Sequence, residues 1–255
     1  MNARNRTSMI LLPLIGAVAA VALWWGVTRL FHIRTFFLPA PPDVVNSFKT
    51  QPSYLLQESW QTLKEMLLGF LIAAVGGLVI AIALAASRTI ERLTLPLFVA
   101  LNAIPKVAVA PLLVVWLGFG SEPKIVMVAL ISFFPIVVST MAGLTSTPTD
   151  LGELSRSLSA SWGQTYLKFR LPWALPQIFT GLKVGITLAV IGAVVSEIAS
   201  PQHGLGAVIL LSGQNLDTPL AFAAITLLAL ISVALFYLVV GVERLLLPWA
   251  KEIAQ

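Results

Sequence analysis

The amino-acid sequence predicts an all-α integral membrane protein with six transmembrane helices. Hydrophobic residues make up 58% of the 255 positions and charged residues only 11%, whereas about 25% of residues are charged in soluble domains. Uncharged runs of 19 or more residues recur along the chain, and about 20 apolar residues let a helix cross the bilayer. These runs lack the alternation of lipid-facing β-strands. A soluble globular protein is therefore excluded, and helices are the expected spanning elements.

The six expected spans belong to a single transmembrane domain that covers residues 1–255. They are approximately residues 10–30, 58–87, 93–119, 125–146, 172–198 and 218–243. The first run could instead be a cleaved signal peptide, because it contains the small-residue pattern Ala17-Val18-Ala19. It continues past that pattern to Thr28, however, and this length favours a span.

Prolines mark two places where the chain should depart from regular spanning helices. Residues 38–42 are rich in proline and precede apolar residues at helix-like spacing over 44–48, which predicts a short interfacial helix. Pro96, Pro105 and Pro111 lie in the third span, where each removes a backbone donor and can kink the helix. Irregular backbone at membrane depth is tolerated only where protein or a water-filled cavity covers it.

The distribution of basic residues predicts the orientation of the chain. If the N-terminus is cytoplasmic, nine of the 16 Lys and Arg residues lie in cytoplasmic segments and five in outside segments, while Lys106 and Lys183 lie within spans. Cytoplasmic loops of membrane proteins are enriched in Lys and Arg, so we expect both termini to be cytoplasmic. This orientation signal also explains the net charge of +5, and we expect no nucleic-acid partner.

The sequence offers few groups for catalysis or metal binding. It has no cysteine, and its two histidines, His32 and His203, are far apart. Disulfides, thiol catalysis and Cys-ligated metal sites are therefore excluded, and a histidine metal site is not expected. The chain also lacks the GxxxxGK[ST] phosphate loop. We expect a non-catalytic chain that holds no metal or other cofactor and does not hydrolyse ATP itself.

The polar loop over residues 147–171 is the one substantial loop expected in the cytoplasm. Asp150 and Glu153 are spaced as in a helix capping box. A helix through this loop would carry an apolar stripe made of Leu151, Leu154, Leu158 and Trp162. Ser155 and Ser159 flank the stripe with small side chains that would allow a neighbour to approach closely. Such a helix would either lie on the lipid headgroups or insert into a groove on a cytoplasmic partner.

The same loop resembles the cytoplasmic signature of bacterial ABC importer permeases. That signature reads Glu-Ala-Ala, three residues, Gly, nine residues, Ile, one residue, Leu-Pro. Glu153, Leu171 and Pro172 match it. The residues that depart from it are Leu154 and Ser155 in place of the alanines, Ser159 in place of the glycine and Phe169 in place of the isoleucine.

Further segments resemble the nitrate, taurine and alkanesulfonate branch of this family. They are Leu38-Pro39-Ala40-Pro41, Ala103-Ile104-Pro105, Ala110-Pro111-Leu112, Trp116-Leu117-Gly118-Phe119-Gly120, Phe133-Phe134-Pro135 and His203-Gly204-Leu205-Gly206. The resemblance covers residues 36–249. It implies the fold of a type I ABC importer permease, which is a multi-pass protein of the bacterial inner membrane with six spans and a short cytoplasmic coupling helix.

The resemblance also implies partners and a function. The partners are two cytoplasmic ATP-binding subunits that use ATP and Mg, a second permease copy in a homodimer, an external solute-binding protein and membrane lipid. The residues implied to contact the ATP-binding subunits are Leu151, Glu153, Leu154, Ser155, Leu158, Ser159 and Trp162. The implied function is the permease subunit of an ATP-driven importer. Nitrate, sulfonates, heterocyclic vitamin precursors and aromatic acids all remain possible solutes.

Two lysines lie near the expected middle of the membrane. At 1.5 Å per residue, Lys106 lies about 20 Å and Lys183 about 17 Å from the cytoplasmic ends of their spans. A lysine at this depth costs roughly 2.5–3.5 kcal/mol, so we expect each to face protein or water. Together with Asn102 and Glu197 they are candidate passage-lining residues, and the two lysines would give the passage a basic lining that favours an anionic solute. Alternatively, one lysine pairs with Glu197 or Asn102, or snorkels to the interface.

Two other classes of protein compete with an importer subunit. An ion- or proton-coupled secondary carrier would normally need a buried acid pair or a proton relay near the core of a span. A membrane-embedded enzyme would need a nucleophile, a metal cluster or an acid pair. The sequence indicates none of these groups at membrane depth, so the importer subunit is the preferred interpretation.

Overall fold

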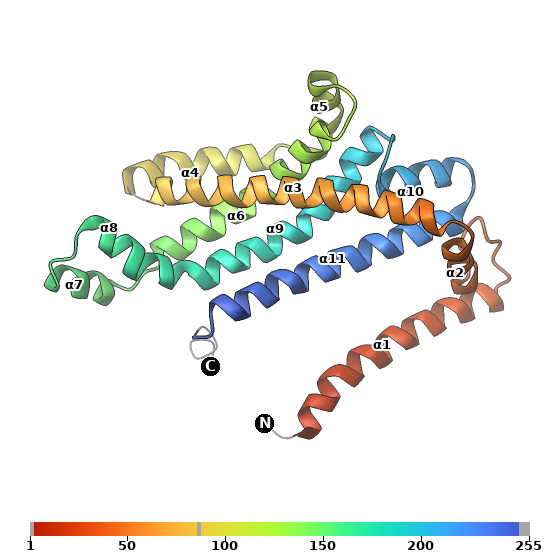
Figure 1. The fold of residues 1–255 in the computed structure, drawn as a ribbon, viewed down its shortest axis with the longest axis horizontal. Helices are drawn as coiled ribbons and strands as arrows, with labels where there is room; N and C mark the ends of the chain where they lie inside the picture. Colours follow the sequence, from red (N-terminus) through yellow and green to blue (C-terminus); the bar gives the residue numbers. More distant parts are fainter. Residues whose placement is uncertain (1–2, 86–87, 250–255) are drawn as a thin grey trace.

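The computed structural model describes residues 3–85 and 88–249, and every regular element within them is a helix. In chain order these are α1 (Ala3–Leu30), α2 (Pro41–Thr50), α3 (Pro52–Ala85), α4 (Arg88–Ala103), η1 (Lys106–Val109), α5 (Ala110–Leu117), α6 (Glu122–Thr145), α7 (Thr149–Ser157), α8 (Trp162–Thr165), η2 (Tyr166–Arg170), α9 (Leu171–Ala199), α10 (Leu205–Gln214) and α11 (Thr218–Leu246). The long helices run between an end that carries α2 and α10 and an end that carries α7 and α8 (Figure 1). We call these the α10 end and the α7 end.

The expected spans lie mostly on helices, but residues 104–105, 118–119 and 146 are not helical, and residues 86 and 87 lie outside the described residues. Four helical stretches are long and apolar enough to cross a membrane, namely Pro52–Ala85, Glu122–Thr145, Gly163–Ala199 and Thr218–Leu246. A fifth candidate is the bent pair Arg92–Ala103 and Lys106–Leu117. The expected first span lies within α1, of which Ile15–Leu30 is apolar.

The proline-rich third span is broken at one of its three prolines, whereas Pro96 lies inside α4 without ending it. Its two halves meet at an angle of 73°. The chain leaves the helical conformation after Ala103, and Pro105 precedes the 3₁₀-helix η1 in an extended conformation. Pro111 lies in the first turn of α5, where its missing N–H costs no helical hydrogen bond. The break therefore lies between α4 and η1.

Two short helices lie at the α10 end (Figure 1). The first, α2, confirms the helix expected after the proline-rich segment, and the Asp43 carboxylate accepts a hydrogen bond from the Ala40 N–H at its start, 3.0 Å away. The second, α10, was not predicted. Its ten residues are apolar but too few to cross a bilayer.

Helices α3, α6 and α9 pack closely because glycines face the neighbouring helix. A Cβ atom on Gly69 of α3 would lie 2.5 Å from Cβ of Val128 in α6, and one on Gly192 of α9 would lie 2.8 Å from Cα of the same valine. Small residues let membrane helices approach in this way. The Ser132 hydroxyl also donates a hydrogen bond of 3.0 Å to the carbonyl of Gly185. These three helices form the tightly packed centre of the protein.

Candidate functional site

The loop helix α7 is shorter than the stripe pattern predicts. It ends at Ser157, so Leu158 and Ser159 follow the helix and Trp162 begins α8. The prediction of one apolar stripe from Leu151 to Trp162 is therefore wrong, because the residues share no single helix. The side chains of Leu154 and Trp162, two members of that stripe, lie outside the described residues. Glu153 is exposed, as expected for the polar face.

The end of α7 explains why the family signature has glycine at position 159. Ser159 adopts a φ of 50°, and the Ala160 N–H donates to the carbonyl of Ser155 at 2.9 Å. This is the Schellman arrangement, in which the residue after the helix is left-handed and is usually glycine. Ser159 is itself exposed. A residue at this position must adopt a left-handed backbone conformation. The expectation that Ser159 is small so that a neighbour can approach closely is therefore not supported.

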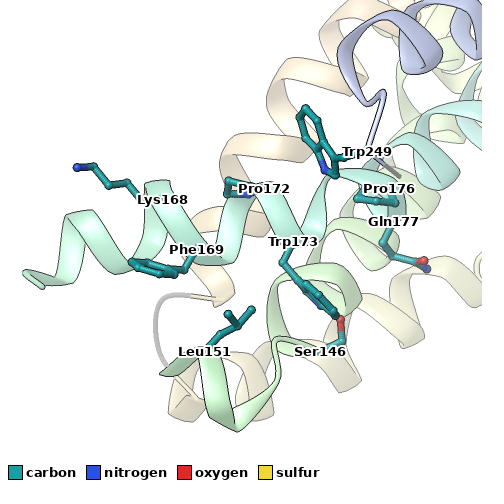
Figure 2. A pocket seen from close by; sticks show the side chains of 9 residues that line it. All are labelled: Ser146, Leu151, Lys168, Phe169, Pro172, Trp173, Pro176, Gln177 and Trp249. Carbon is teal, nitrogen blue, oxygen red and sulfur yellow. The ribbon is translucent and has the colours of Figure 1, made fainter. Parts of the chain in front are cut away.

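Helix α7 lies over a pocket at the start of α9 (Figure 2). The pocket has a volume of about 390 Å³ and is lined by Ser146, Leu151, Lys168, Phe169, Pro172, Trp173, Pro176, Gln177 and Trp249. Leu151 faces this pocket, so it contacts its own chain. Leu158 and Leu167, by contrast, are 64% and 67% exposed. Among the side chains of this loop that the structure describes, the exposed large apolar ones therefore follow α7.

Lys106 lies at the break between α4 and η1, beside a second pocket. This pocket of about 440 Å³ is lined by Asn102, Ala103, Ile104, Pro105, Lys106, Ile131, Phe134, Pro135 and Leu188. The Lys106 ammonium donates a hydrogen bond to the side-chain oxygen of Asn102 and lies 5.8 Å from the centre of the Phe134 ring. The structure thus brings together two of the candidate passage-lining residues, and neither of these contacts neutralises the charge of Lys106.

Lys183 has a different partner from those that the sequence indicated. Its ammonium lies 3.0 Å from both carboxylate oxygens of Glu243 in α11, and the two side chains are 24% and 20% exposed. The expected alternatives were Glu197 and Asn102. Glu243 lies 60 residues away in the chain, so no local spacing could reveal the pair. The charge of Lys183 is balanced within this chain, which argues against a free basic lining at this position.

Glu197 is fully buried, so the structure contradicts its expected place on the wall of a passage. Its carboxylate accepts hydrogen bonds from the Thr62 hydroxyl of α3 at 2.7 Å and from the Gly206 N–H of α10 at 2.6 Å. The Thr62 hydroxyl in turn accepts from the Leu205 N–H at 2.8 Å. Glu58 of α3 accepts from the Gly204 N–H. Two carboxylates thus satisfy the free N–H groups at the start of α10, where negative charge is favourable.

A buried ion pair extends this cluster to α6. Lys124 and Glu65 are 2% and 1% exposed and lie 3.6 Å apart. Lys124 also donates a hydrogen bond of 2.7 Å to the carbonyl of His203. Sequence reasoning missed the cluster, although Glu58, Thr62 and Glu65 recur at positions 58, 62 and 65, which share one face of a helix. That polar stripe in the outer turns of a span was the available signal.

Comparisons with known proteins agree with this architecture. Residues 73–251 match the family described as "Binding-protein-dependent transport system inner membrane component". The chain is 37% identical to a riboflavin transport system permease protein of Chloroflexus aurantiacus, over 90% of this chain and 86% of the relative. It is 30% identical to a taurine transport system permease protein of Escherichia coli, over 94% and 90% of the two chains.

The fold has solved counterparts. A chain of the MetNI methionine ABC transporter in an inward facing conformation superimposes with a TM-score of 0.63 at 22% sequence identity, over 76% of this chain and 99% of that chain. The helical architecture is thus that of type I importer permeases. Together with the family match, the similarity supports an importer subunit and not a secondary carrier. The chain belongs to the family of binding-protein-dependent transport system inner membrane components and is a multi-pass permease subunit of an ABC importer.

Proposed function

We propose that two copies of this permease form a passage for a small anionic solute, and that Lys106 at the helix break is the group that favours the anion. The observation that carries the proposal is the position of Lys106 beside a pocket of about 440 Å³, with the neutral Asn102 as its hydrogen-bond partner. A cation whose described partners are neutral, as those of Lys106 are, attracts an anion in a dry or partly wet cavity far more strongly than it would in water. Asn102 would hold the ammonium toward the pocket until the solute arrives.

The solutes named for relatives are compatible with this preference but do not define it. Taurine and aliphatic sulfonates, for which two relatives are named, carry a sulfonate group. Other relatives are named for riboflavin and for formylaminopyrimidine, which lack that group. The anion preference proposed here therefore rests on Lys106 and not on the names.

The partners are proposed to bind at opposite ends. Two ATP-binding subunits would dock at the α7 end and hydrolyse ATP with Mg, and Leu158 and Leu167 offer exposed apolar surface there. A solute-binding protein would deliver the solute at the α10 end. The larger number of basic residues in the segments expected at the α7 end supports a cytoplasmic position of that end. The C-terminal end of α1 and the N-terminal end of α11 both lie at the α10 end (Figure 1). Both termini of the chain would then be cytoplasmic.

Uptake into proteoliposomes tests the role of Lys106. The complex with its ATP-binding subunits is reconstituted, and the binding protein is loaded with labelled taurine, ethanesulfonate or nitrate in separate assays. We expect Lys106→Met to lower uptake of the transported anion about tenfold or more, since a hydrogen bond to a charged group contributes about 1.5–3 kcal/mol. Lys106→Arg should retain uptake. Lys64→Met, which removes an exposed lysine from α3, is the matched control. Unchanged uptake in Lys106→Met would refute the proposed role.

A further inference from the structure

The buried cluster at the α10 end joins the three central helices to α10. Glu197 and Thr62 bind the first N–H groups of α10 from α9 and α3, and Lys124 binds the carbonyl of His203 from α6. Buried polar groups are costly unless they are paired, whereas a satisfied network strengthens its own bonds and fixes the geometry of the elements that it joins. Both carboxylate oxygens of Glu197 are paired, whereas the Oε2 atom of Glu65 is buried without a hydrogen-bond partner. The part of the cluster around Glu197 is therefore expected to hold α3, α9 and α10 in one arrangement.

Two glycines show how tightly the Glu197 carboxylate fits against the start of α10. A Cβ atom on Gly204 would lie 2.1 Å from one carboxylate oxygen of Glu197, and one on Gly206 would lie 2.8 Å from the other. Gly204 also has a φ of 105°, a conformation that other residues rarely adopt. The carboxylate thus occupies the space that side chains at these positions would fill, and α10 cannot shift without breaking its hydrogen bonds.

Glycines hold α6 against α9 at the α7 end as well, since a Cβ atom on Gly143 near the end of α6 would lie 2.9 Å from Cβ of Gln177. The two ends of the protein differ in the segments that follow these tightly packed helices. Close contacts at Gly69 and Gly192 lock α3 and α9 to α6 at the centre, and the cluster extends this packing to α10. At the α7 end the chain instead forms the π-helix η2, turns through Ser159 with positive φ, and surrounds an open pocket. π-Helical turns often accompany functional sites. Displacement of the α7 end would therefore reach the α10 end through α9.

We infer that Glu197 is a positioning residue that fastens α10 to α3 and α9, so that the α10 end moves as one body when the α7 end is displaced. The functional part of this inference rests on the proposed docking of ATP-binding subunits at the α7 end. Its structural part does not, because the cluster lies within one chain. Two measurements separate the two parts.

Hydrogen exchange of the purified complex measures the fastening directly. In Glu197→Ala the Gly206 amide should exchange about tenfold faster or more, because its acceptor is lost. The Leu205 amide should also exchange faster, because its acceptor Thr62 loses the carboxylate that orients its hydroxyl. Glu122→Ala removes an exposed glutamate from the same end and should leave this exchange unchanged. Unchanged exchange in Glu197→Ala would overturn the inference.

Two further variants separate positioning from charge. In Glu197→Gln the amide can still accept from Gly206 and donate to Thr62, so protection should remain near that of the wild type. Gly206→Ala keeps every charge but pushes a methyl group against Glu197, so it should loosen α10 as Glu197→Ala does. This variant also serves if Glu197→Ala does not assemble. A Gln variant as exchange-labile as the Ala variant would show that charge, not positioning, is the role of Glu197.

ATP hydrolysis in proteoliposomes tests the functional part. Stimulation of the wild-type complex by its solute-loaded binding protein is measured first, and its absence would count against the proposed function alone. Given that stimulation, Gly206→Ala should keep basal hydrolysis and co-purification with the ATP-binding subunits but lose at least half of the stimulation, whereas Glu197→Gln retains it. Full stimulation in a Gly206→Ala complex whose α10 amides exchange faster would overturn the functional part of the inference.

Discussion

The ion pair between Lys183 and Glu243 should behave as a unit in a double-mutant cycle. Two hydrogen bonds of 3.0 Å join α9 to α11 here, and both side chains are about three-quarters buried. Exposed pairs contribute about 0–1 kcal/mol, whereas breaking a buried pair costs about 3–5 kcal/mol. The intermediate exposure places Lys183→Met and Glu243→Gln at about 2 kcal/mol of destabilisation each.

The double variant should recover most of that loss, because no unpaired charge is left between the helices. For a chain of this length, about 1 kcal/mol corresponds to roughly 2–4 °C in melting temperature. We therefore expect each single variant to melt about 4–8 °C lower than the wild type and the double variant to melt within a few degrees of it.

Thermal unfolding of the detergent-purified complex, followed by intrinsic tryptophan fluorescence, is a suitable assay. Lys64→Met, Glu122→Gln and their combination form the control cycle, since both residues are exposed. If the losses of Lys183→Met and Glu243→Gln simply added in the double variant, the two groups would not be coupled. Uptake measured on the double variant separates stability from transport. If the double variant recovered its stability but lost uptake, Lys183 would be needed for transport and would again be a candidate passage-lining residue.

Two further predictions concern the α7 end. Ser159→Gly should raise the stability of the loop helix by about 1 kcal/mol, since a left-handed conformation costs other residues about 1–2 kcal/mol; slower amide exchange over residues 149–157 would support this, and faster exchange would contradict it. Leu158→Arg should abolish co-purification of the ATP-binding subunits, because it places a charge on an apolar docking surface, whereas Arg156→Ala is the control and should assemble normally. If Leu158→Arg assembled normally as well, the loop would not dock through this residue and a position on the lipid headgroups would be favoured.

Much of the fold could be predicted from the sequence because hydrophobicity and proline act locally. The uncharged runs gave the positions of the four long apolar helices that could cross a membrane among the described residues and of the bent pair in the third span, since a helix that crosses the bilayer needs about 20 apolar residues. The prolines of the third span indicated that a break was possible, and Pro105 lies at it. Pro96, Pro135 and Pro176 lie inside helices, so the prolines alone did not decide which position breaks. The proline-rich segment gave the start of α2, because proline is favourable in the first turn of a helix, where its missing N–H costs no hydrogen bond.

The loop helix shows where a local pattern is insufficient. The spacing of Leu151 and Leu158 fits a helix, yet the chain turns at Ser159 before the pattern is complete. Periodicity measures which face a residue would occupy if the helix continued, but it contains no information about the backbone angle that ends it. The signature glycine was the available clue, because glycine is favoured where φ is positive.

Only the tertiary structure decided which partners the charged side chains bind. Glu197 binds Thr62, 135 residues away in the chain, and Lys183 binds Glu243. The sequence by itself determined that these charged groups near or within the spans needed partners, since an unpaired charge in a low-dielectric region is costly. The choice of partner depends on how the spans pack and rotate against one another, and close packing at positions such as Gly69 and Gly192 fixes that arrangement.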